Sequence, residues 1–301
     1  MFDVIPLGVA SALPTLNRHF SATAVVREGR VFLFDCGEGT QLQLGRAALK
    51  RPRIEAIFIT HFHGDHCLGL AGMSQRISLD RVAHPVHIHY PGSGQVYYDR
   101  LRKASIFHDV ADIVPHPITA PGVIYRDKKL TISTLPLDHG VPTWGFRMEE
   151  ADSRRMLPER LEQAGVRGPQ IGQLIRDGQI TIDGKTVELV DVSVDKPGQS
   201  AAFIMDTRMC ENALELARGV DLLICESTFL ARDADKAHAH GHLTAAQAAT
   251  IARDAGARML VLTHFSQRYP ATQAFLDEAA PIFADVIAAR DADVIPVPPR
   301  L

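Results

Sequence analysis

Residues 59–66 read Ile-Thr-His-Phe-His-Gly-Asp-His, and four of these side chains can bind a metal ion. They follow the apolar run Ile54–Thr60, which predicts a buried strand and places the cluster where that strand ends. On extended chain His61 and His63 point the same way and can hold one ion. The aspartate and the histidine beyond the glycine turn can reach a second ion. The spacing therefore predicts a site for two metal ions.

Three further candidate ligands each follow or end a predicted strand: Asp206 after Ala201–Met205, His264 after Met259–Thr263, and His139 after Leu130–Asp138. Neutral imidazole and carboxylate are the ligands expected for zinc, and one carboxylate can bridge two ions. We expect two Zn²⁺ per subunit, with Mn²⁺ as the alternative metal. The expected ligands are His61, His63 and His139 for the first ion, Asp65, His66 and His264 for the second, and Asp206 for both.

A short internal repeat supports this arrangement. Ile57–Phe62 and Leu260–Phe265 share one form, an apolar strand running into Thr-His-Phe. Two parts of the chain therefore each offer a strand end to a shared cleft, which predicts a core of two sheets with the site at one edge.

Composition indicates a globular chain. Of 301 residues, 46% are hydrophobic, enough to bury a large core, and no linker rich in Pro, Gly or Ser divides the chain. We therefore expect a single domain over residues 1–301. No apolar run reaches about 18 residues and the first residues lack a signal-peptide pattern, so a cytoplasmic location is expected. The four cysteines have no C-x-x-C spacing and are expected to be reduced, although Cys67, beside His66, is an alternative ligand.

Strand and helix patterns alternate along the chain. This mixture favours an α/β sandwich, two sheets covered by helices, over a purely parallel sheet. The N-terminal Val4–Gly8 and Thr23–Phe34 segments predict antiparallel strands. The other predicted strands are Val31–Asp35, Ile54–Thr60, Val86–Tyr90, Leu130–Leu135, Ala201–Met205, Asp221–Cys225 and Met259–Thr263, and the predicted helices include Ala245–Ala255 and Thr272–Phe283.

A stretch over about residues 152–198 interrupts this alternation with repeated Gly and Pro, including Gly168-Pro169. It lies between two predicted strands and is therefore interpreted as an insertion. Residues 151–176 hold five arginines against three acidic residues, which is only weakly basic. A solvated surface loop has a similar composition, so charge alone does not assign the insertion a function.

The chain resembles ribonuclease Z, a family of the metallo-β-lactamase superfamily that matures the 3′ end of transfer RNA. The resemblance implies an αββα sandwich with an inserted arm that clamps the transfer RNA, a homodimer, and zinc-dependent cleavage of the 3′ trailer that leaves a 3′-hydroxyl on the tRNA and a 5′-phosphate on the trailer. The matching segments, besides residues 61–66, are Leu7–Pro14, Phe34–Gln41, Asp138–Pro142, Gly145–Arg147, Asp206–Arg208, Glu226–Phe229, Gly241–Thr244 and Thr263–Tyr269.

The chemistry also follows from the residue types. Two cations lower the pKa of bound water and stabilise charge on phosphate oxygens. Asp65 is then the candidate proton acceptor, and His242, oriented by Glu226, is the candidate general acid for the leaving 3′-oxygen. The family usually shows His-Glu-Ala-Thr and His-Ser-Thr here, whereas this chain has Cys-Glu-Ser-Thr and His-Leu-Thr. The alternative role for His242 is to cap the following helix, and His238 and His240 are expected to be exposed loop residues.

Charge leaves the partner open. Thirty-two basic and 35 acidic residues give a net charge of −3, which argues mildly against nucleic acid. Residues 43–53 nevertheless carry four basic side chains and no acidic one, a patch that could meet phosphates or simply face solvent. In the loop Pro14–His19, Leu16 replaces the lysine common in the family, while Arg18 is predicted to be available for RNA. We therefore expect weak discrimination against tRNA that already bears CCA.

Two other functions fit parts of the pattern. A hydrolase of small phosphodiesters or sulfate esters on the same fold would have the same metal site, and its inserted arm would bind no substrate. A non-catalytic metal or RNA-binding protein would need neither Glu226 nor His242, so the complete residue set disfavours it.

Overall fold

The structure is a computed structural model that describes residues 2–300. The chain divides into two compact units. The larger unit runs to Glu149 and resumes at Gln199, and the smaller unit, the insert, comprises Glu150–Gly198. The larger unit contains two seven-stranded sheets.

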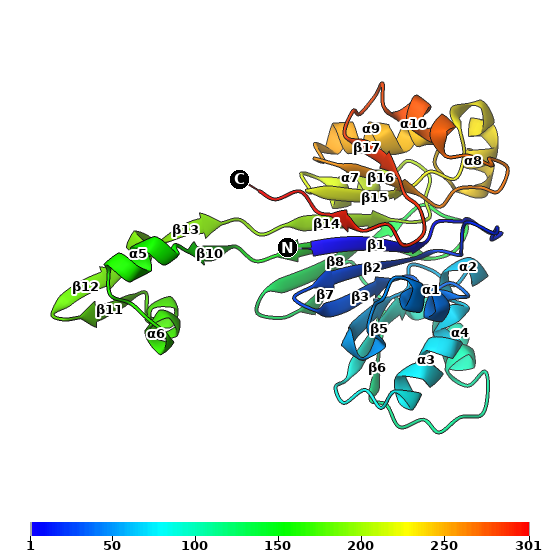
Figure 1. The fold of residues 1–301 in the computed structure, drawn as a ribbon. Coiled ribbons are helices and arrows are strands. Elements are labelled where there is room, and N and C mark those ends of the chain that lie inside the picture. The colour runs from blue at the N-terminus through cyan, green and yellow to red at the C-terminus, as the bar shows by residue number, and fades with distance from the viewer. Residues whose placement is uncertain (1, 301) are drawn as a thin grey trace. The chain divides into compact units, whose positions relative to one another are not determined.

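The first sheet has the order β18-β1-β2-β3-β4-β5-β6 (Figure 1). Its β18-β1-β2-β3 half is antiparallel and its β3-β4-β5-β6 half is parallel. The strands are β1 (Phe2–Gly8), β2 (Ala22–Arg27), β3 (Arg30–Phe34), β4 (Ile54–Phe58), β5 (Val86–Pro91), β6 (Ile113–Ile118) and β18 (Ile295–Pro296). Its helices are α1 (Thr40–Arg46), α2 (Gly64–Cys67), α3 (Gly69–Leu79) and α4 (Gln95–Arg102), with the 3₁₀ turns η1 (Arg51–Arg53) and η2 (Gly92–Gly94).

The second sheet has the order β17-β16-β15-β14-β9-β8-β7, and β14 to β17 are parallel. The strands are β7 (Gly122–Arg126), β8 (Leu130–Leu137), β9 (Thr143–Glu150), β14 (Ser200–Ile204), β15 (Leu222–Glu226), β16 (Leu260–Thr263) and β17 (Val286–Ala288). The helices are α7 (Glu211–Ala217), α8 (Ala234–His240), α9 (Ala245–Ala255) and α10 (Gln273–Ala279), with the 3₁₀ turn η4 (Ala231–Asp233).

Helices cover the outer faces of both sheets, so the larger unit is an αββα sandwich (Figure 1). Both faces of the sheets are apolar, as β3 shows. Its side chains alternate between the two faces: Phe32 and Phe34 face the second sheet, whereas Val31 and Leu33 face the helices. The Phe34 ring stacks on Phe203 across the two sheets, with centroids 3.7 Å apart. This confirms the fold class predicted from the sequence.

The insert has its own small core. It contains two antiparallel strand pairs, β10 with β13 and β11 with β12, and buries Leu161, Val166, Leu174, Ile180, Val187 and Val192. The Gly168-Pro169 element starts a helix, where proline is well tolerated because its missing N–H would have no partner. The elements are β10 (Ser153–Met156), α5 (Pro158–Gln163), α6 (Pro169–Asp177), β11 (Gln179–Ile182), β12 (Lys185–Glu188), η3 (Leu189–Val192) and β13 (Ser193–Lys196).

Predicted element bounds agree closely where the sequence carries a cap. The helix Ala245–Ala255 has the predicted limits, since Thr244 and Gln247 form a capping box and Gly256 ends it in the left-handed conformation. The predicted helix Thr272–Phe283 is wrong at its end, because α10 stops at Ala279 with no terminating glycine. No helix among residues 2–300 combines the length and apolar character needed to cross a membrane.

Candidate metal centre

The site lies where the carboxyl ends of parallel strands meet, the usual place for ligands in such sheets. In the first sheet β3 leads to Asp35 and β4 leads to His61; in the second sheet β14 leads to Asp206 and β16 to His264. Asp35 and His264 both adopt left-handed backbone, with φ of 61° and 62°. Non-glycine residues rarely adopt this conformation, and strained backbone of this kind clusters at functional sites.

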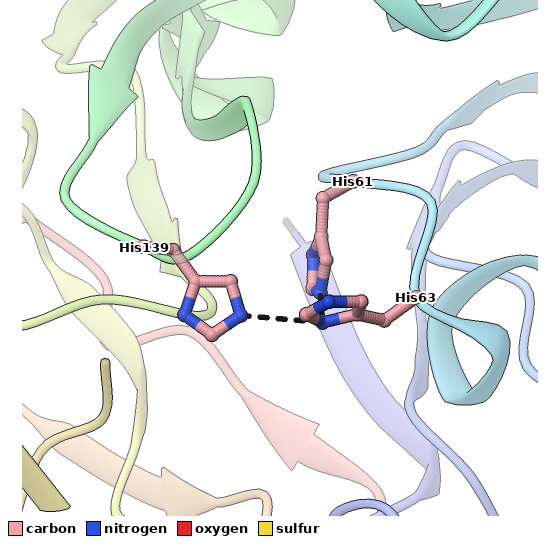
Figure 2. A group of neighbouring side chains, drawn as sticks. All are labelled: His61, His63 and His139. Carbon is pink, nitrogen blue, oxygen red and sulfur yellow. Dashed lines mark hydrogen bonds between the residues drawn. The ribbon is translucent and has the colours of Figure 1, made fainter. Parts of the chain in front are cut away.

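The first predicted ligand group is assembled in the structure (Figure 2). The Nε2 atom of His61 lies 3.0 Å from Nδ1 of His63, and Nε2 of His139 lies 3.3 Å from that same Nδ1 atom. His61 is fully buried, whereas His63 is exposed to the pocket. The three imidazoles thus present one nitrogen each to a common point.

The second predicted group is also assembled. The Nε2 atoms of His66 and His264 lie 3.1 Å apart, and Oδ2 of Asp65 is 3.4 Å and 3.5 Å from them. Asp206 stands between the groups, since its Oδ2 atom is 3.3 Å from Nε2 of His66 and 3.8 Å from Nε2 of His61.

These separations fit metal ligands. Two nitrogens bound to one tetrahedral zinc ion at about 2.0–2.1 Å lie roughly 3.3 Å apart. Oδ1 of Asp206 is buried without a hydrogen bond among the described residues, which a cation would relieve. Glu226 is close enough to count as a ligand, but its oxygens already accept hydrogen bonds from Thr207 and Thr228. The residues present therefore suit divalent cations.

A buried carboxylate fixes the first-sheet ligands. Asp35 accepts hydrogen bonds from the backbone N–H and the hydroxyl of Thr60 at Oδ1, and its Oδ2 is 2.7 Å from Nδ1 of His66. Because the Thr60 hydroxyl donates to Asp35, it accepts from Nδ1 of His61 at 2.9 Å. Both imidazoles are thereby held in the tautomer that directs Nε2 at the metal position.

Glu226 plays the matching part in the second sheet. The hydroxyl of Thr228 donates to Oε2 of Glu226 at 2.6 Å and therefore accepts from Nδ1 of His264 at 2.9 Å. Glu226 also contacts Nδ1 of His242 directly, at 3.0 Å. Each carboxylate thus orients one imidazole directly and one through a threonine.

His139 is oriented by backbone. Its Nδ1 atom donates to the carbonyl of Gly241 at 2.8 Å, which leaves Nε2 for the metal position. Gly241 has φ 75°, and a Cβ there would lie 2.7 Å from Nδ1 of His139. Only glycine permits both the turn and this approach.

The electrostatics of these protein groups are those of a cation site. Burial and the neighbouring His66 hold the pKa of His61 well below its ordinary value, so His61 stays neutral, as a ligand must. Burial opposes ionisation of Asp65, but His66 and His264 outweigh it and lower the pKa of Asp65 far below its usual range. Burial also opposes a charge on His66, yet the carboxylates of Asp206, Asp35 and Asp65 raise its pKa well above the ordinary value. The carboxylates therefore favour positive charge at this point.

His242 is not a helix cap, because Thr244 caps α9 with its own side chain. Burial alone would lower the pKa of His242, but the carboxylates of Glu226 and Asp206 raise it to about 9. Its ring lines the pocket, and its Nδ1 atom is held by Glu226. A proton on Nε2 is therefore available to a group in the pocket.

The pocket at the metal position has a volume of about 810 Å³. Apart from the metal-site residues, its lining includes Leu13, Phe229, His240 and Arg268. Arg268 is the one Lys or Arg in this lining, it is exposed, and no hydrogen bond or ion pair of its guanidinium is found within residues 2–300.

Several residues differ from expectation. Asp35, Thr60 and Thr228 were not assigned roles from the sequence, although Asp35 follows a predicted strand just as the ligands do. Cys67 is not a ligand, since its side chain packs in the core between the first sheet and its helices. His238 and His240 are exposed as expected, although they lie on α8 and not in a loop, and His240 lines the pocket.

One expectation about a basic residue is wrong. Arg18 is not available for RNA, because it is only 8% exposed and donates to the carbonyls of Tyr269 and Pro270. Leu16, in contrast, is 97% exposed. The basic patch at residues 43–53 is partly neutralised, since Arg51 pairs with Asp80.

The fold and the site define a protein of the metallo-β-lactamase superfamily. The family model of the metallo-β-lactamase superfamily matches residues 18–151, and that of a β-lactamase superfamily domain matches residues 175–265. The chain belongs to the ribonuclease Z family.

Three similar proteins carry this assignment. Ribonuclease Z of Nocardia farcinica is 50% identical over 99% of this chain and 98% of its own length. Ribonuclease Z of Salinispora arenicola is 45% identical over 99% of this chain and 97% of its own. The crystal structure of human tRNase Z, short form, superposes with a TM-score of 0.72 at 30% identity, covering 98% of this chain and 99% of that one.

Proposed function

We propose that this chain is a metal-dependent endoribonuclease that cleaves the 3′ trailer from precursor tRNA, leaving a 3′-hydroxyl on the tRNA and a 5′-phosphate on the trailer. The observation that carries the proposal is the assembly of both ligand groups and the Glu226–His242 pair around one pocket in a chain 50% identical to a ribonuclease Z. A hydrolase of small phosphodiesters or sulfate esters is not favoured, because the similarity extends over nearly the whole length of the relatives.

The proposed ligands are His61, His63 and His139 for one Zn²⁺, Asp65, His66 and His264 for a second, and Asp206 for both. When bound, two divalent ions activate water near neutral pH and neutralise charge on the phosphate. Zinc is the expected metal because the donors are mostly imidazole, and manganese is the alternative.

Proton transfer falls to the protein. Asp65 is ionised and lines the pocket, so it can accept a proton from the attacking water. His242 carries a proton on the nitrogen that faces away from Glu226 and can donate it to the leaving 3′-oxygen. Without that proton the alkoxide would be a poor leaving group.

Arg268 supplies a fixed positive charge at the same pocket. An exposed guanidinium with no hydrogen bond or ion pair to the described residues suits a phosphate of the bound strand, because it can donate two parallel hydrogen bonds to its oxygens.

The insert is the proposed contact with the body of the tRNA. Of its five arginines within residues 151–176, Arg154 pairs with Asp195 and Arg160 donates to a backbone carbonyl. Arg155, Arg167 and Arg176 are exposed and make no ion pair within the described residues. These three can contact backbone phosphates without sequence preference.

A homodimer is the proposed assembly. A groove between α1 and α3 is lined by Gly45, Gly69 and Gly72 and by Leu42 and Leu68, which are 57% and 52% exposed. Apolar side chains beside a glycine-lined groove suit a second copy of the chain. Light scattering coupled to sizing chromatography tests this, with Leu42→Asp expected to give monomers.

A cytoplasmic location stays a prediction, in keeping with four free cysteines. The deciding experiment for function is cleavage of a precursor tRNA at nanomolar enzyme, with both product ends mapped. Cleavage of small diesters alone, with the precursor left intact, would contradict the proposal.

A further inference from the structure

Two aromatic side chains on the pocket wall have no part in the chemistry described above. Phe229 follows β15, and His240 is the last residue of α8. Both line the pocket that holds the metal ligands. Their ring planes are within 14° of parallel, with centroids 6.5 Å apart.

The backbone around both rings is fixed. The Phe229 N–H donates to the carbonyl of Leu243, and the His242 N–H donates to that of Ala237. Between His240 and His242, the Gly241 carbonyl accepts from the metal ligand His139. The two rings are therefore anchored to the same short segment that positions the proposed acid and a proposed ligand.

The two rings differ in exposure. Phe229 is 6% exposed and belongs to the larger hydrophobic core. The His240 side chain is exposed, and no hydrogen bond or ion pair of its ring nitrogens occurs in the described part of the chain. Its ring is thus free for a ligand, and the buried Phe229 ring lies nearly parallel to it.

We propose that His240, backed by Phe229, is the stacking surface for one nucleobase of the RNA substrate, a subsite that rests on the proposed function. Proteins that bind single-stranded RNA commonly stack bases on aromatic rings, imidazole included. The base belongs to the nucleotide that carries the leaving 3′-oxygen, the last nucleotide of the tRNA product. The reason is proximity: His240 lies two residues before His242, the proposed acid for this oxygen, and both line the same pocket. The Phe229 ring behind His240 is also 6.1 Å, centroid to centroid, from the His242 ring.

The test compares kcat/KM on a precursor tRNA for His240→Ala, His240→Phe and His238→Ala. His238 is the matched control, because it is an exposed histidine on the same helix but does not line the pocket. Loss of one stacked base predicts a decrease of about 5- to 100-fold for His240→Ala. His240→Phe should restore most of the activity, and His238→Ala should match the unmodified enzyme. Metal content is measured for each variant, so that a disturbed His139 is recognised.

Abasic substrates identify the base. With the base removed from the last tRNA nucleotide, His240→Ala and the unmodified enzyme should cleave at equal rates; with the base removed from the first trailer nucleotide, the difference should persist. The subsite would be overturned if His240→Ala lost the same factor in activity on the intact and on both abasic substrates. It would also be overturned if His240→Phe did not restore the activity lost in His240→Ala. The proposed function fails separately, if the unmodified enzyme does not cleave precursor tRNA at the mapped site.

Discussion

The Oδ2 atom of Asp35 lies 2.7 Å from Nδ1 of the proposed metal ligand His66, and both residues are buried. Asp35 also accepts two hydrogen bonds from Thr60 and a longer one, 3.4 Å, from the Ser21 hydroxyl, so its two oxygens serve four donors. An asparagine at position 35 has only one acceptor oxygen. If that oxygen accepts from Thr60, the NH₂ group faces the N–H of His66, and two donors then oppose each other.

Asp35→Asn should therefore weaken metal binding by about 10- to 100-fold, the usual cost of losing such a supporting carboxylate. Competition with a chromophoric chelator measures this directly, without reference to activity. Asp291→Asn is the matched control, since Asp291 is a largely buried carboxylate that contacts the imidazole of His19 away from the metal pocket. Equal metal affinity in both variants would show that Asp35 does not orient His66.

His242→Ala should slow cleavage of precursor tRNA by about 10²–10⁴-fold, because a 3′-alkoxide needs a proton to leave. The loss should be much smaller on a nitrophenyl phosphodiester, whose leaving group is a stable anion. The measurement is kcat on both substrates with fully metal-loaded protein. The same loss on both would assign His242 a structural role.

Arg268→Gln should weaken precursor binding. Because it removes one phosphate contact, it should also reduce the slope of log Kd against log salt concentration by about 0.7, the value for one contact to single-stranded RNA. Filter binding over a range of salt concentrations gives this slope. Arg253→Gln is the control, because Arg253 is exposed on α9 and pairs with Asp254. An unchanged slope for Arg268→Gln would rule out the phosphate contact.

Replacing residues 152–197 with Asn-Gly should preserve the metal site and remove most of the affinity for the tRNA body. The design is suitable because Glu149 and Ser200 are paired neighbours on β9 and β14, so a short turn can join them. Hydrolysis of a small phosphodiester should stay within a few-fold of the full chain, whereas KM for precursor tRNA should rise strongly. Loss of both activities in a folded protein would mean that the insert supports the catalytic unit.

His89 should make stability depend on pH. Its ring is buried in a stack between Phe58 and His116, and its Nε2 atom has no partner within the described residues. Burial, helped by His116 and His87, lowers the pKa of His89 from 6.5 to about 3. The unfolded chain therefore binds this proton below about pH 6.5 while the folded chain does not, so stability falls as the pH drops from 6.5 toward 3.

The cost reaches about 2 kcal/mol at pH 5. His89→Phe, which fits the stack, should remove this part of the pH dependence in urea unfolding measured from pH 7 to pH 5. His108→Ala, an exposed histidine, should leave it unchanged. If the slope of His89→Phe equals that of the unmodified protein, His89 is not the group responsible.

The sequence by itself determined the strands that end in ligands and the αββα class. Apolar runs such as Ile54–Thr60 and Met259–Thr263 predict buried strands, and a side chain directly after such a run must lie where the strand ends. The sequence likewise predicted the helix Ala245–Ala255, because its limits depend only on neighbouring residues, the Thr244–Gln247 capping box and Gly256. These inferences succeed because local spacing alone decides them.

Only the tertiary structure decided which partners support the ligands and which basic residues are free. Thr228 supports His264, 36 positions further along the chain, and Asp35 supports His66, 31 positions away. Arg18 looked available in the sequence but is buried against the carbonyl of Tyr269, 251 positions away. No local pattern encodes such contacts, because they depend on how β3, β4, β15 and β16 bring distant strand ends together in two stacked sheets.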